Sequence, residues 1–152
     1  MNTGDTPQVA RALKGRCMCG EIRYELQQTP AFMGVCHCKH CQRQSGSAFS
    51  TMAGVPRDSF TLLRGTPTIY RGSGDTGEPT EIGFCGRCGS PVYTLLANQP
   101  EMIYLKTGTL DDTEWFEPQF HVWCAQKQRW VDLDTSSNLS SRSTGQGAGP
   151  AF

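Results

Sequence analysis

Three cysteines within six residues are the feature that most constrains how this chain can fold. Cys36, Cys38 and Cys41 lie in the run CHCKHC. Alternate side chains of extended backbone point to the same side, so the C-x-C half places two sulfurs side by side. The C-x-x-C half brings its sulfurs together across a tight loop, a spacing typical of zinc sites. The run therefore predicts three ligands to one metal ion with a fourth position open, which is the arrangement of a catalytic zinc.

Two further cysteine pairs leave the grouping of the thiols open. Cys17 and Cys19 form a C-x-C pair, and Cys85 and Cys88 form a C-x-x-C pair. One arrangement joins these four in a closed structural site and leaves the central three as the open one. A second arrangement joins the first pair with the first two central cysteines and the second pair with Cys41. The first is favoured, because it keeps the central run whole and builds the closed site from two distant turns.

Other residues near the central run are candidates for its fourth ligand. His37 lies between two cysteines and should point away from the metal, whereas His40 is better placed to hydrogen-bond a ligand than to be one. Cys124 is a lone thiol in an apolar stretch and is expected in the core. His121 is interpreted as a hydrogen-bonded structural imidazole, with a position lining a cleft as the alternative. If His37, His40 or Cys124 were a fourth ligand, both sites would be structural.

Length and charge bound the class of protein. The 152 residues predict one domain, and seven of the eight cysteines fall in metal-binding patterns rather than a disulfide framework. The first twelve residues hold no apolar run typical of a signal peptide, and no stretch approaches the ~20 apolar residues of a membrane span. Lys and Arg balance Asp and Glu at 14 each, which argues against nucleic acid as a partner. We expect a soluble cytoplasmic protein; its oligomeric state is not indicated.

The pattern of apolar residues favours a mainly β fold built from short antiparallel strands, with little helix. Seventeen glycines and nine prolines separate short runs that alternate polar and apolar residues. A helical turn is expected at 42–46, stopped by Gly46. The expected strands are 21–26, 47–55, 60–64, 68–71, 80–84, 91–96, 102–106 and 120–124, with an exposed loop at 72–79.

Composition also predicts the division of the chain. Residues 1–13 are polar and unpatterned and are expected to form a flexible N-terminal arm. The zinc-binding domain should span 14–134. Residues 135–152 are rich in Ser and Gly and are expected to form a flexible tail.

The order of the motifs resembles the glutathione-dependent formaldehyde-activating enzyme family, which includes centromere protein V-like zinc domains. The resemblance runs from about Lys14 to Leu133. The motifs that carry it are Cys17-x-Cys19-Gly20, Cys36-His37-Cys38-x-x-Cys41, Ser45-Gly46-Ser47-Ala48-Phe49, Phe84-Cys85-x-x-Cys88-Gly89-Ser90, Gly108-Thr109-Leu110-Asp111-Asp112, and Pro118-x-x-His121-Val122-Trp123 with Trp130.

The resemblance implies a β-tent fold with two zinc ions. It implies a structural zinc and a catalytic zinc, whose ligands are respectively Cys17, Cys19, Cys85 and Cys88, and Cys36, Cys38 and Cys41. The implied activity is that of a carbon–sulfur lyase of the S-(hydroxymethyl)glutathione synthase type, which adds a thiol such as glutathione to a small aldehyde such as formaldehyde.

Two cations flank the central run and are candidates for substrate binding. Lys39 and Arg43 could meet the carboxylates of glutathione, although both could equally be solvated surface charges. The competing hypothesis is a non-catalytic zinc module that binds a protein or a nucleic acid. An open metal position that faces a cleft would favour the enzyme.

Overall fold

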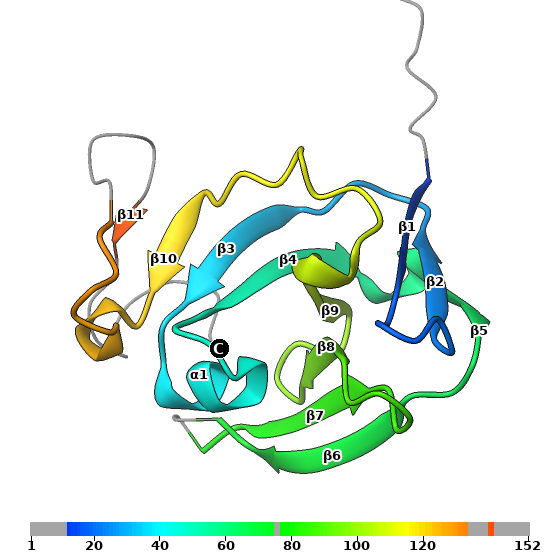
Figure 1. Cartoon of the computed structure of the whole chain (residues 1–152), viewed down its shortest axis with the longest axis horizontal. Coiled ribbons are helices and arrows are strands. Elements are labelled where there is room, and N and C mark those ends of the chain that lie inside the picture. Colours follow the sequence, from blue (N-terminus) through cyan, green and yellow to red (C-terminus); the bar gives the residue numbers. More distant parts are fainter. Residues whose placement is uncertain (1–11, 75–76, 134–139, 142–152) are drawn as a thin grey trace, which may run out of the picture.

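The described part of the chain forms two β-sheets and one α-helix (Figure 1). The computed structural model describes residues 12–74, 77–133 and 140–141. The strands are β1 (Leu13–Arg16), β2 (Arg23–Leu26), β3 (Phe32–Cys36), β4 (Ser50–Pro56), β5 (Phe60–Arg64), β6 (Thr68–Ser73), β7 (Pro79–Phe84), β8 (Pro91–Leu96), β9 (Met102–Lys106), β10 (Phe120–Val122) and β11 (Ser140–Ser141). The helices are α1 (Lys39–Ser45) and three 3-10 turns, η1 (Arg57–Ser59), η2 (Thr107–Thr109) and η3 (Cys124–Gln126). The prediction of a mainly β fold with little helix is confirmed.

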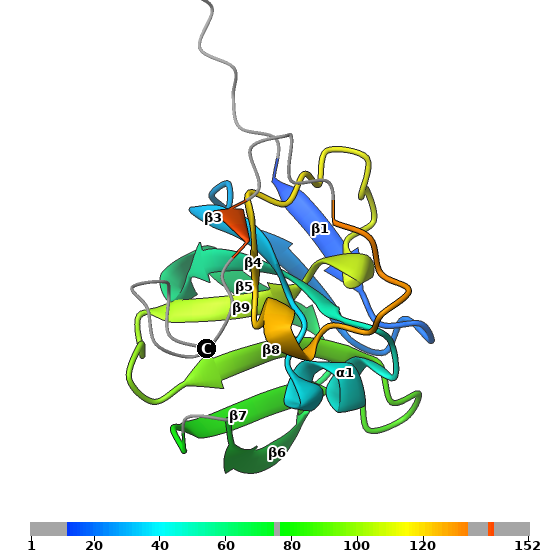
Figure 2. The same ribbon diagram turned by 90° about the vertical axis from the view of Figure 1, so that its left-hand side faces the viewer.

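The two sheets differ in size and in strand direction. The small sheet has the order β1-β2-β5, and its strands are antiparallel. The large sheet has the order β11-β10-β3-β4-β9-β8-β7-β6, and Figure 2 shows β9, β8, β7 and β6 following one another across it. Its strands are antiparallel except β10, which runs parallel to both β3 and β11. Among the described residues, no helix is long and apolar enough to cross a membrane.

The alternation of side chains along the central strands separates two cores. In β9, Ile103 and Leu105 face the small sheet, and they pack with Ala53 of β4 and with Tyr24 of β2. Tyr104 of the same strand faces the opposite side, where a second cluster includes Cys36, Met52, Leu96 and Val122. Figure 1 shows the small sheet and α1 on opposite sides of β4, β9 and β8. One face of the large sheet is thus closed by the small sheet, and the other lies under α1.

Helix α1 begins and ends at residues with clear capping roles. Cys38 is the N-cap, and its sulfur accepts a hydrogen bond from the backbone N–H of Cys41. Gly46 is the C-cap in the left-handed conformation, with φ of 61°, which glycine adopts without steric cost. The expected stop at Gly46 is confirmed, but the helix starts three residues earlier than the sequence pattern indicates.

Several strand boundaries differ from the predictions. The expected strand 21–26 begins at Arg23, because the chain is still turning after Cys19, and the expected strand 47–55 begins at Ser50. The expected exposed loop at 72–79 is shorter, because β6 continues to Ser73 and β7 starts at Pro79. Strands β1 and β3 were not predicted.

The prediction that 120–124 is one strand with Cys124 in the core is wrong. Strand β10 ends at Val122, because Trp123 adopts φ of 59°, a value that breaks extended backbone. Cys124 therefore starts the turn η3 and is only half-buried.

The two terminal predictions fall mainly on parts that the structure does not describe. Of the expected arm, 1–13, only residues 12 and 13 are described, and Leu13 opens β1. Of the expected tail, 135–152, only Ser140 and Ser141 are described, and they pair with β10.

Candidate metal centres and the adjoining pocket

The first thiol cluster joins turns from the two sheets. Cys17 and Cys19 lie in the turn between β1 and β2, and Cys85 and Cys88 lie in the turn between β7 and β8. The four sulfurs all lie within 4.8 Å of one another. The sulfur of Cys19 is 3.6 Å from that of Cys17 and 3.8 Å from that of Cys85. Four sulfurs at about 2.3 Å from a tetrahedral zinc would be separated by about 3.8 Å, so the donor set fits this ion.

Neighbouring hydrogen bonds favour the thiolate forms of Cys17 and Cys88, whereas the pKa of Cys19 is raised to about 11. The backbone N–H of Ile22 donates to the sulfur of Cys17, at 3.2 Å. The sulfur of Cys88 lies 3.2 Å from the hydroxyl of Ser90. Hydrogen bonds from the Ser90 side chain and backbone lower the pKa of Cys88 to about 5. A group that is ionised near neutral pH is prepared to bind a cation.

The second cluster contains the three cysteines of the central run. Cys36 ends β3, Cys38 caps α1, and Cys41 lies in its first turn, so one strand-to-helix connection supplies all three sulfurs. The Cys38 and Cys41 side chains and burial raise the pKa of Cys36 far above its usual value. A divalent cation between the sulfurs would reverse this effect, because it favours the thiolate form of each ligand. The three closely spaced and largely buried thiols thus fit a metal site.

The seven cysteines group as four and three, in the first of the two arrangements considered from the sequence. Within the described part of the chain, neither group includes Cys124 or a histidine. His37 turns away from the cysteines, and its Nε2 lies 2.8 Å from Nδ1 of His121. Burial, followed by the charge of His121, lowers the pKa of His37 to about 4, so the pair is neutral near pH 7. His121 is thus hydrogen-bonded, as expected for a structural imidazole, and His37 is directed to it rather than to the thiols.

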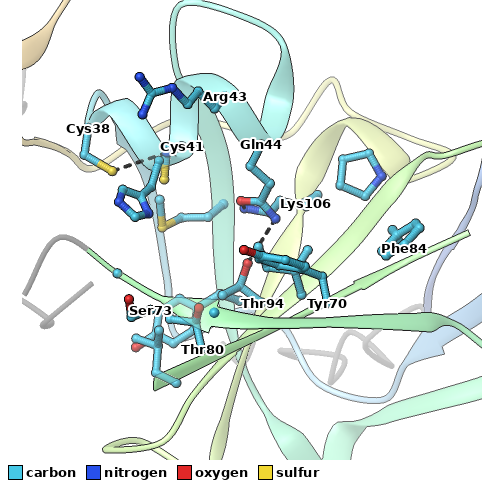
Figure 3. Close-up of a pocket in the computed structure, with 18 of the residues that line it drawn as sticks. Cys38, Cys41, Arg43, Gln44, Tyr70, Ser73, Thr80, Phe84, Thr94 and Lys106 are labelled. Atoms are coloured by element: carbon cyan, nitrogen blue, oxygen red, sulfur yellow. Dashed lines mark hydrogen bonds between the residues drawn. The ribbon is translucent and has the colours of Figure 1, made fainter. Parts of the chain in front are cut away.

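A pocket of about 700 Å³ opens beside the three-cysteine cluster (Figure 3). Helix α1 contributes Cys41, Arg43 and Gln44 to one wall, with Cys38 at its start. The opposite wall comes from β6, β7 and β8, and it presents mainly apolar and hydroxyl side chains: Tyr70, Ser73, Thr80, Ile82, Phe84, Thr94 and Leu96. Two of the three clustered cysteines thus line a space large enough for a small peptide.

The two flanking cations differ in their relation to this pocket. Arg43 lines it, as Figure 3 shows. Lys39 does not: it lines a shallower hollow with Trp130, and its Nζ donates to the side chain of Gln42 at 3.3 Å. The geometry therefore favours Arg43 over Lys39 as a residue that could meet a ligand in the pocket.

Lys106 is a pocket residue that the sequence reasoning missed. It ends β9, its side chain is buried, and its Nζ donates to Oε1 of Gln44 at 2.9 Å and to Oγ of Ser50 at 3.0 Å. Burial lowers the pKa of Lys106, while the thiols of the three-cysteine cluster act in the opposite direction. A lysine at the end of an expected strand gives no sequence signal of burial, because lysine is ordinarily exposed.

The fold and the two clusters define a class of protein: a cysteine-rich, mainly β domain with a group of four cysteines and a group of three, of which the second lies beside a pocket. Residues 12–126 match the family model described as glutathione-dependent formaldehyde-activating enzyme, and the chain belongs to this family. The chain is also similar to a crystal structure of a Rhodobacter sphaeroides protein, with 25% sequence identity and a TM-score of 0.52. That match covers 69% of this chain and 91% of the other.

Proposed function

We propose that this protein is a zinc-dependent carbon–sulfur lyase-type enzyme that adds a thiol, most simply glutathione, to a small aldehyde such as formaldehyde. The observation that carries the proposal is that Cys38 and Cys41 line the pocket. A substrate in the pocket could therefore reach a metal held by the three-cysteine cluster. Membership of a formaldehyde-activating family supports the reaction class.

The two thiol clusters would have unequal roles in this enzyme. Cys36, Cys38 and Cys41 would hold a catalytic zinc, because three protein ligands leave a position for substrate. Cys17, Cys19, Cys85 and Cys88 would hold a structural zinc, because their four sulfurs complete a tetrahedron. When bound at the three-cysteine site, zinc would supply a position that takes a thiol as its thiolate.

The chain's own residues would bring the two reactants together. The apolar wall formed by Ile82, Phe84 and Leu96 would exclude water from the reacting atoms. Arg43 would bind a carboxylate of the thiol compound. Lys39 lines a neighbouring hollow and does not line this pocket. The thiolate sulfur forms a C–S bond to the carbonyl carbon as the C=O π bond opens. The oxygen takes up one proton, which balances the proton that the thiol loses, and the product is an S-hydroxymethyl thiol. Addition to so reactive an aldehyde depends mainly on proximity.

Calorimetry with glutathione and S-methylglutathione tests this proposal. Free thiols are mostly protonated near neutral pH, so binding as thiolate releases a proton that two buffers of different ionisation enthalpy would count. We expect glutathione to bind with about one proton released, and S-methylglutathione to bind at least about tenfold more weakly. Equal affinities without proton release would refute thiol binding at the metal, and no acceleration of the addition would leave a metal-binding module.

A further inference from the structure

Lys106 is a buried cation for which the described residues offer no carboxylate partner. Its Nζ is held by two neutral acceptors, Gln44 and Ser50, and the described residues include no carboxylate within ion-pair distance. An ammonium has three N–H donors, and no described residue accepts the third. Because a buried charge is costly unless it is paired, its counter-charge is expected from the thiol cluster that lines the same pocket and from a ligand bound there.

Strand register places this ammonium on the same side of the sheet as the three-cysteine cluster. Cys36 of β3 lies opposite Ser50 of β4, and Met52, two residues further on, lies opposite Lys106 of β9. Residues directly opposite share a face, as do residues two apart in one strand. The side chains of Cys36, Ser50, Met52 and Lys106 therefore all project from the face covered by α1.

The position of the amine is fixed by a hydrogen-bonded chain across the pocket. Nε2 of Gln44 lies 3.4 Å from Oγ1 of Thr94, which directs Oε1 of the same amide toward Lys106. Ser50 holds Nζ from the opposite strand. Figure 3 shows Gln44, Thr94 and Lys106 meeting in the middle of the pocket. Because two hydrogen bonds hold Nζ, its positive charge stays at one position in the pocket, unlike the charge of a mobile surface lysine.

The negative charge expected at the metal centre would be balanced by such a cation. Three thiolates and one divalent ion have a formal charge of −1, and a fourth thiolate brings it to −2. No acidic side chain is among the described residues that line the pocket, whereas Arg43 and Lys106 supply two positive charges. A doubly negative group in a partly apolar cavity requires this compensation.

We propose that Lys106 is a specificity-determining residue, whose ammonium selects an anionic fourth ligand at the three-cysteine centre. This inference rests on the proposed function, since it concerns how the same site accepts its thiol. The ammonium would offer its third N–H to a thiolate that binds at this centre. A neutral ligand such as an imidazole gains nothing from this charge.

The test compares two ligands in the cobalt-substituted holoprotein. 2-Mercaptoethanol binds as a thiolate and has no carboxylate for Arg43, whereas imidazole binds without charge. Binding is followed by the absorption bands of the metal, so the readout does not depend on turnover. In Lys106→Met we expect the affinity for 2-mercaptoethanol to fall by about tenfold or more, with that for imidazole within about threefold of wild type. Lys106→Arg retains the charge and should restore most of the thiolate preference.

Controls keep the outcomes separate. Lys14→Met removes an exposed lysine of β1 that does not line the pocket, and it should leave both affinities unchanged. If Lys106→Met does not fold, Lys106→Gln replaces it with the same expectation. The inference would be overturned if the affinities for 2-mercaptoethanol and imidazole fell equally, or if the affinity for 2-mercaptoethanol did not change. Loss of the metal from both Lys106→Met and Lys106→Gln would also overturn it. Wild-type thiolate binding without catalysed addition would refute the proposed function instead.

Discussion

At the scale of single residues, two glycines permit aromatic rings to lie flat on the large sheet. A Cβ added at Gly34 would overlap the ring of Phe120, and one added at Gly54 would overlap the ring of Phe32. The two rings are themselves 5.8 Å apart, centroid to centroid. This packing holds β10 and β3 against the core that contains the three-cysteine cluster.

Gly34→Ala should therefore destabilise the protein by about 1–3 kcal/mol, because the ring of Phe120 must move out of its packed position. Gly108→Ala is the matched control, since an added Cβ at Gly108 meets nothing within 4 Å. Urea unfolding of both variants measures the difference. Equal midpoints for the two variants would show that the ring adapts without cost.

At the scale of elements, α1 is too short to be stable by itself and is held by one buried side chain. The helix has seven residues, well below the length at which an isolated helix forms. Nε2 of Gln42 donates to the carbonyl oxygens of His37 and Gln126, at 2.7 and 2.9 Å. These bonds join the helix to the connection that precedes it and to η3, and so they determine where Cys41 lies.

Gln42→Ala should lower the free energy of unfolding by about 1–3 kcal/mol, because it leaves two carbonyl groups without their donor. The metal at the three-cysteine cluster should also exchange faster. The comparison variant is Gln27→Ala, whose exposed side chain donates to Glu25, and its expected effect is within about 0.5 kcal/mol. Thermal unfolding and the rate of metal transfer to a chelator measure the two effects. A normal transfer rate in Gln42→Ala would contradict this role for the helix.

At the scale of the whole molecule, the four-cysteine cluster joins the small sheet to the large one. Its two turns are more than sixty residues apart in the chain, and the sulfurs of Cys19 and Cys85 meet at 3.8 Å. The three-cysteine cluster lies within one continuous segment, Cys36 to Cys41, so it closes no comparable loop. Stability and activity are accordingly expected to depend on different clusters.

Cys88→Ser should lower Tm by at least about 10 °C or prevent folding, because metal binding at a closed site is coupled to folding. Cys38→Ser should retain nearly the wild-type Tm, since serine is also a good N-cap for α1, but it should lose thiol binding. Circular dichroism and metal analysis on both variants provide the measurement. Similar losses of Tm would remove the distinction between the two clusters.

The sequence by itself determined the local features of this protein. Most strands and the end of α1 at Gly46 follow from alternation and turn residues, which act over a few neighbours. The close grouping of Cys36, Cys38 and Cys41 likewise follows from backbone geometry within six residues. Strand β3 was not predicted, because its apolar run of five residues is too short to show the two-residue period of a strand. The positive φ of Trp123 has no sequence signal, so the end of β10 was missed.

The tertiary structure alone decided which distant residues meet. The cysteine spacing allowed two groupings, and the pairing of β7 with β8 beside the turn after β1 selected one of them. In the sequence, the position of Lys106 at the end of an alternating strand does not distinguish it from an exposed lysine. Only the register of β9 against β4 places it on the face of Cys36, under α1. Side-chain alternation tells which residues of a strand share a face, but the face that becomes the pocket is determined by what packs against it.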